Sequence, residues 1–83
     1  MARKDEINEA LVTAASEGSL VEVLKLLAKG ADINHVGDLE GGMTALQSAA
    51  KYGHADLVEL LINKGADIEA KDNDGRTVLM HAA

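Results

Sequence analysis

The stretch GMTALQSAAKYGH at residues 42–54 decides the fold, because it carries both the start signal and the stop signal of a short helix. Thr44 is a good N-cap residue, and Gln47 stands three residues later, as in the capping-box pattern. Gly53 suits the position just after a helix, because glycine adopts the left-handed conformation at little cost. The apolar positions between these signals follow the helical period and are Leu46, Ala49 and Ala50. The stretch therefore predicts a short helix with a small apolar face.

A second helix is predicted from about residue 54 to residue 64, directly after the first. Its apolar positions recur at spacings of three and four residues and are Ala55, Val58, Leu61 and Ile62. Gly65 ends this helix in the way that Gly53 ends the first. The turn-forming residues 72–75 (DNDG) then separate it from the next threonine, Thr77. Together these segments make one helix-turn-helix unit followed by a turn.

This unit is repeated along the chain. A shift of 35 residues lays residues 29–33 (KGADI) on residues 64–68 (KGADI). A shift of 33 residues lays residues 42–46 (GMTAL) on residues 75–79 (GRTVL), so a two-residue insertion lies within residues 35–41. The first unit repeats the apolar pattern with Leu11, Ala14, Ala15, Leu20, Val23, Leu26 and Leu27. A period in this range is typical of stacked units that bury their apolar faces only against one another.

At these positions the chain resembles the ankyrin repeat family. The resemblance rests on residues 42–54, 60–61, 65–68 and 72–83, and it covers the chain from Leu11 onward. It implies L-shaped units stacked in an all-α ankyrin repeat solenoid, with hairpin-like fingers beside a concave face made by the first helices. It also implies a non-catalytic module that binds proteins and carries no cofactor.

We expect a single ankyrin repeat domain over residues 1–83. Its parts are an N-terminal capping repeat (1–34), a second repeat with the insertion in its finger (35–70) and an incomplete third repeat (71–83). In the second unit, Ala45 and Gln47 replace the proline and the histidine of the family's Thr-Pro-Leu-His motif. Gln47 can still cap the helix through its side-chain amide.

The resemblance maps the protein-binding positions onto the fingers and the concave face. The finger positions are His35, Val36, Leu39, Glu40 and Met43 in the first finger and Lys71, Asn73, Asp74 and Arg76 in the second. The concave positions are Ser16, Glu17, Ser48, Lys51 and Tyr52. Tyr52 is the best candidate for a binding hot spot, because aromatic side chains dominate binding energy. Alternatively, Tyr52 only covers the adjacent helix ends. Val36, Leu39 and Met43 are apolar in a loop that is normally polar, so they either contact a partner or pack the inserted residues against the stack.

A second hypothesis is that the chain is a self-associating, truncated or engineered repeat fragment. Glu22 and Lys25 of the first unit stand where the second unit has Leu57 and Leu60, and polar residues there are expected on the outer face of a capping repeat. Because the third unit lacks a second helix, we expect an uncovered apolar edge formed by Leu57, Leu60, Leu79 and Met80. Another copy could cover this edge, as a symmetric dimer or a continued stack.

The composition limits the other partners. The chain has 8 basic and 14 acidic residues and a formal net charge of −6, which argues against nucleic acid because phosphate binding needs a basic face. No apolar stretch approaches the ~18 residues of a membrane span, so no membrane partner is expected. The absence of cysteine rules out a disulfide framework. We expect a soluble, cytoplasmic protein.

The residues that suggest chemistry have simpler interpretations. Aligning Gly75 with the invariant glycine of a calcium loop puts Ala70 and His81 at ligand positions, which excludes a calcium site. The three histidines lack ligand spacing, and His54 stands at the family's structural Gly-His position. The glycines at residues 41–42 are followed by no Lys-Ser or Lys-Thr, as a phosphate loop requires. We therefore predict no catalytic, metal or cofactor site.

Overall fold

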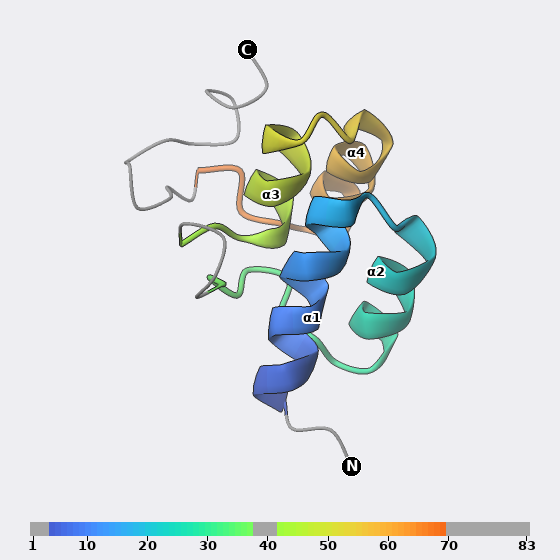
Figure 1. Ribbon diagram of the computed structural model, residues 1–83, viewed down its shortest axis with the longest axis vertical. Helices are drawn as coiled ribbons and strands as arrows, with labels where there is room; N and C mark the ends of the chain where they lie inside the picture. The colour runs from blue at the N-terminus through green and yellow to red at the C-terminus, as the bar shows by residue number, and fades with distance from the viewer. Residues whose placement is uncertain (1–3, 38–41, 70–83) are drawn as a thin grey trace.

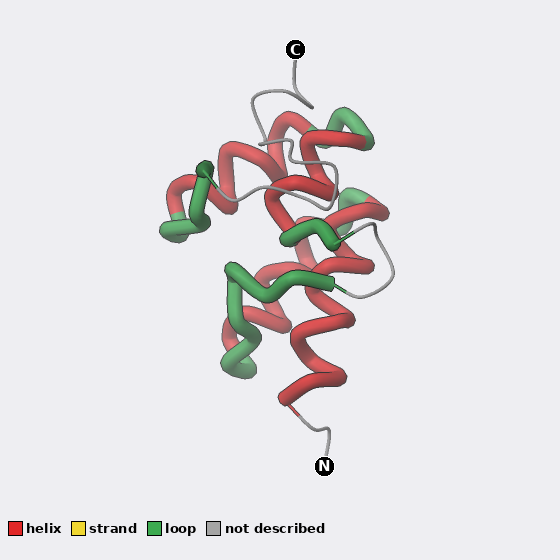
Figure 2. The backbone as a smooth tube through the Cα atoms, turned by 90° about the vertical axis from the view of Figure 1, so that its left-hand side faces the viewer, coloured by secondary structure: helices red, strands yellow, loops and turns green. Residues whose placement is uncertain are grey.

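The computed structural model describes residues 4–37 and 42–69, which form helices joined by turns (Figure 1). The helices are α1 (Lys4–Glu17), α2 (Leu20–Ala28), α3 (Ala45–Lys51) and α4 (Ala55–Asn63), and this described part contains no strand. Helix α1 packs against α2, α3 packs against α4, and α1 packs against α3. Figure 2 shows the loops after α2 and α4 on the same side of the stack. Two helical hairpins are therefore stacked through their first helices, which confirms the predicted all-α repeat solenoid.

The ends of α3 follow the predicted local signals. The Thr44 hydroxyl accepts a hydrogen bond from the Gln47 main-chain N–H at 3.3 Å, and the Gln47 side-chain oxygen accepts one from the Thr44 N–H at 2.8 Å. This is the expected capping box, and it confirms the predicted start of the helix. Gly53 follows the helix with φ of 74°, as expected for its stop. Helix α4 is one residue shorter at each end than expected, because His54 and Lys64 are its N-cap and C-cap residues.

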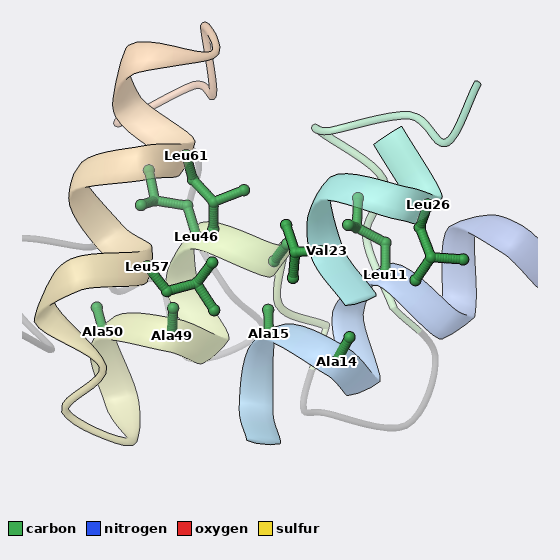
Figure 3. Packing of buried hydrophobic residues seen from close by; sticks show 11 residues of the cluster. Leu11, Ala14, Ala15, Val23, Leu26, Leu46, Ala49, Ala50, Leu57 and Leu61 are labelled. Atoms are coloured by element: carbon green, nitrogen blue, oxygen red, sulfur yellow. The ribbon is translucent and has the colours of Figure 1, made fainter. Parts of the chain in front are cut away.

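The core lies between the two helix pairs and is built from aliphatic side chains (Figure 3). Its buried members come from all four helices and are Leu11, Ala14, Ala15, Val23, Leu26, Ala45, Leu46, Ala49, Ala50, Leu57 and Leu61. Ala15 and Ala49 are fully buried, and their small side chains allow α1 and α3 to pack closely. This packing needs no large aromatic ring, which agrees with the absence of Phe and Trp from the sequence.

Polar contacts also join the two units. The Nε2–H of His54 donates to the main-chain carbonyl of Ser16 at 2.9 Å. The His54 ring lies beside Gly18, where an added Cβ would come within 2.6 Å of Nδ1. At the loops, the main-chain N–H of Asp67 donates to the side-chain oxygen of Asn34 at 2.8 Å. The second unit therefore completes hydrogen bonds of the first, and His54 has a structural role at their junction.

The prediction that Leu57 lies at an uncovered self-association edge is wrong. Its side chain is 1% exposed and belongs to the core, and Leu60 is partly buried against the same core. Figure 3 shows Leu57 pointing from α4 toward the first unit. The equivalent residue of the first unit, Glu22, is exposed. Glu22 lies on the side of the first unit that faces away from the second unit. Leu57 lies on the same side of the second unit, and that side faces the first unit. The other members of the predicted edge lie outside the described residues and are Leu79 and Met80.

Candidate partner-binding surface

The first finger connects α2 to α3, and its base is held against α1. The main-chain N–H of Gly37 donates to the carbonyl of Met43 at 2.9 Å, which closes the base. An added Cβ at Gly37 would lie 3.0 Å from Cγ1 of Val12, so the close approach of the finger to α1 favours glycine there. The imidazole of His35 contacts the carboxylate of Glu9 on α1. These contacts hold the base of the finger against α1.

The apolar residues of this finger do not share one environment. Val36 is 50% exposed, whereas Met43 is 4% exposed. The interpretation of Met43 as a contact residue is therefore wrong, because its side chain is buried. His35 is partly buried through its contact with Glu9. The other predicted finger residues lie outside the described residues and are Leu39, Glu40, Lys71, Asn73, Asp74 and Arg76.

Tyr52 is exposed at the end of α3, where it is the C-cap residue. Its side chain is 49% exposed, and the ammonium group of Lys51 lies 5.5 Å from the centroid of its ring, within cation–π distance. The equivalent residue one unit earlier is Glu17, which is exposed at the end of α1. Ser16 is partly exposed, and its hydroxyl donates to the carbonyl of Thr13 at 2.7 Å. Figure 1 shows α1 and α3 running in the same direction, so their C-terminal ends, which carry these groups, lie on the same side of the molecule.

Ser48 does not belong to the exposed surface. It is fully buried, and its hydroxyl oxygen has no hydrogen-bond partner within the described part of the chain. Its equivalent in α1, Thr13, is exposed. Every residue of α3 from Ala45 to Ala50 is buried, so this helix has far less free surface than α1. The prediction that Ser48 contacts a partner is therefore wrong.

The described residues hold no group of three or more His, Cys, Asp or Glu side chains that is placed to bind a metal ion. None of the helices within residues 4–37 and 42–69 is long and apolar enough to cross a membrane. The C-terminal ends of α1 and α3 and the base of the finger carry an aromatic ring, a cation, carboxylates and one exposed valine.

The comparison with known protein families agrees with this architecture. The family model described as "Ankyrin repeats (3 copies)" matches residues 10–83. The chain belongs to the ankyrin repeat family. Ankyrin repeats in general mediate protein–protein interaction, and the repeats themselves are not catalytic.

Several curated proteins contain an ankyrin segment similar to this chain. The chain is 40% identical over 74 residues to the probable E3 ubiquitin-protein ligase XBOS33 of Oryza sativa subsp. japonica, covering 89% of this chain and 14% of that protein. It is 42% identical over 66 residues to the ankyrin repeat-containing protein P1E11.10 of Schizosaccharomyces pombe, covering 80% and 31%. It is 44% identical over 69 residues to the neurogenic locus Notch protein of Drosophila melanogaster, covering 82% and 2%. The chain thus spans less than a third of the length of each of these relatives.

One exposed apolar part of this ankyrin repeat unit was not predicted from the sequence. On the side of α2 opposite its buried residues, which we call the outer face of the helix, Val21 is 64% exposed and Leu24 is 43% exposed. The internal repeat carries the signal that could have found them, because a shift of 35 residues lays Val21 and Leu24 on Asp56 and Glu59. The same outer position is thus apolar in one ankyrin repeat and charged in the next.

Proposed function

We propose that this chain is a non-catalytic interaction module that binds a partner protein through two surfaces. One is the family's concave face, here the C-terminal ends of α1 and α3, and the other is the first finger. The observation that carries the proposal is the exposed ring of Tyr52 beside the ammonium group of Lys51. A large aromatic side chain bordered by a cation is typical of a binding hot spot. Because α3 buries its preceding residues, this end is the part of α3 that can meet a partner.

The exposed side of α1 supports a partner with basic groups. Within residues 6–17 its exposed positions recur at spacings of four, three and four residues and are Glu6, Ala10, Thr13 and Glu17. This spacing places them on one face of the helix, with a carboxylate at each end. Val36 adds an exposed apolar contact at the finger. The surface therefore favours a partner segment that sets basic side chains against α1 and an apolar or aromatic group against Tyr52.

The test is to capture the partner and then measure its affinity for variants by titration calorimetry. Tyr52→Ala is expected to weaken binding by about 2 kcal/mol, or about thirtyfold in Kd, because it removes the hot-spot ring. Asn63→Ala, an exposed substitution on α4, is the matched control and should leave Kd unchanged. Both variants should remain folded, which far-ultraviolet circular dichroism can check. A Tyr52→Ala affinity within a factor of two of the unaltered value would refute the proposal.

A further inference from the structure

The outer face of α2 differs from that of α4, and stacking of the units does not explain the difference. The outer positions of α4 are occupied by Asp56, Glu59 and Asn63. The same positions of α2 are occupied by Val21, Leu24 and Ala28, all of which are exposed. We name these three residues the α2 stripe, because spacings of three and four residues put them on one face of the helix. This face is opposite the buried residues Val23 and Leu26, so the α2 stripe points away from the core. The α2 stripe is therefore an exposed apolar surface that another apolar surface can cover.

A hollow borders the C-terminal end of the α2 stripe. Its volume is about 430 Å³, and it is lined by Leu24, Leu27, Ala28, Ala31, Ile33 and Lys64. Val21, the most exposed residue of the stripe, stands at the opposite end of the same helix. The helical rise places Val21 and Ala28 about 10 Å apart along the axis. The N-terminal end of α2 thus carries an exposed side chain, and its C-terminal end borders a hollow. In two antiparallel copies of α2, the exposed side chain of each copy would lie opposite the hollow of the other.

The charges beside the α2 stripe have the same self-complementary arrangement. Glu22, Lys25 and Lys29 are exposed and recur at spacings of three and four residues, so they follow one flank of the stripe. In an antiparallel pair related by a twofold axis, this flank of one helix meets the same flank of the other with its direction reversed. Glu22 of each copy would then face Lys25 and Lys29 of the other, so the pairing brings opposite charges together.

We propose that a second copy of this chain docks on the α2 stripe and forms a twofold-symmetric dimer with antiparallel α2 helices. Val21 of each copy occupies the hollow of the other, and the two Leu24 side chains meet near the axis. The α2 stripe is separate from the C-terminal ends of α1 and α3 and from the finger, which bind a partner under the proposed function. It is also separate from the self-association edge that was predicted around Leu57. Because α2 has only nine residues, the interface lies at the small end of the size range and the dimer is weak and concentration-dependent.

The first test is sedimentation equilibrium over a series from low micromolar to millimolar concentration. The unaltered chain is expected to change from the mass of a monomer to that of a dimer. The double variant Val21→Asp with Leu24→Glu copies the exposed residues of α4, so it should fold normally, which circular dichroism can check, and remain monomeric. A monomeric unaltered chain at millimolar concentration would overturn the proposal, and so would a dimer that persists in the folded double variant.

The second test examines the antiparallel pairing. Glu22→Lys should raise the dimer dissociation constant about tenfold at low salt, because it places lysines opposite one another. This change lowers the net negative charge, so a general charge effect would instead strengthen association. Adding Lys25→Glu and Lys29→Glu should restore the affinity. Asp56→Lys makes the same charge change on α4 and should not weaken the dimer. A failed restoration, or a control that weakens the dimer as much as Glu22→Lys, would overturn the antiparallel dimer.

Discussion

The contact between Gly18 and His54 leads to a quantitative prediction for Gly18→Ala. The backbone at Gly18 has φ of 75°, where an alanine costs about 1–2 kcal/mol. The new Cβ would stand 2.6 Å from Nδ1 and 2.7 Å from Cε1 of His54, so the ring must move. That movement disrupts the hydrogen bond from His54 to the Ser16 carbonyl, which contributes about 0.5–1.5 kcal/mol. We expect the free energy of unfolding to fall by about 1.5–3.5 kcal/mol in total.

The second repeat supplies the matched control. Gly53 follows α3 as Gly18 follows α1, with φ of 74° and no described atom within 4 Å of an added Cβ. Gly53→Ala should therefore lose only the backbone contribution of about 1–2 kcal/mol. Urea unfolding followed by far-ultraviolet circular dichroism measures both variants.

A double-mutant cycle isolates the contribution of the ring. His54→Ala removes the atoms that the new methyl group meets, so the loss in the Gly18→Ala, His54→Ala double variant should be smaller than the sum of the two single losses. Equal losses for the two glycine variants, together with additive losses in the cycle, would refute the explanation that the His54 ring requires glycine at residue 18.

Three further predictions concern buried groups. Ser48→Ala removes a buried hydroxyl without a partner in the described part of the chain and raises helix propensity, so we expect the free energy of unfolding to rise by about 1 kcal/mol, measured by thermal denaturation. Thr44→Ala removes the capping box and should cost about 0.5–2 kcal/mol in urea unfolding, whereas Thr44→Ser keeps the accepting oxygen and should retain most of the stability. Leu57→Ala should cost about 2–5 kcal/mol by the same measurement, while a loss below about 0.5 kcal/mol would mean that Leu57 is exposed after all.

The features of α3 that could be predicted from the sequence are those set by neighbouring residues. The capping box of Thr44 and Gln47 needs only residues three apart, and the stop at Gly53 needs only one residue with a left-handed backbone. The repeat then identifies the stacked architecture, because the same signals recur at a fixed spacing.

Burial was harder to predict, because it depends on which neighbour a side chain meets. Helical spacing places Leu57 on an apolar face but does not show whether that face contacts the preceding unit or the following one. In the structure it contacts the preceding unit. Likewise, mapping contact positions from the family treats each repeat alike. Thr13 and Ser48 occupy equivalent positions, yet Thr13 is exposed and Ser48 is buried.

Because the base of the first finger is closed, the number of residues in the finger can change with little effect on the stability of the stack. A main-chain hydrogen bond joins Gly37 to Met43, and Val12 packs beside Gly37, so residues added between Gly37 and Met43 can leave this closed base in place. Loop closure becomes less favourable by only about 0.6 kcal/mol for each doubling of loop length. An addition between Gly18 and Ser19 would instead shift the junction of the two units. Chains built on this plan can therefore gain or lose finger residues during evolution while the stack stays intact, and a foreign binding loop could be grafted at the same place.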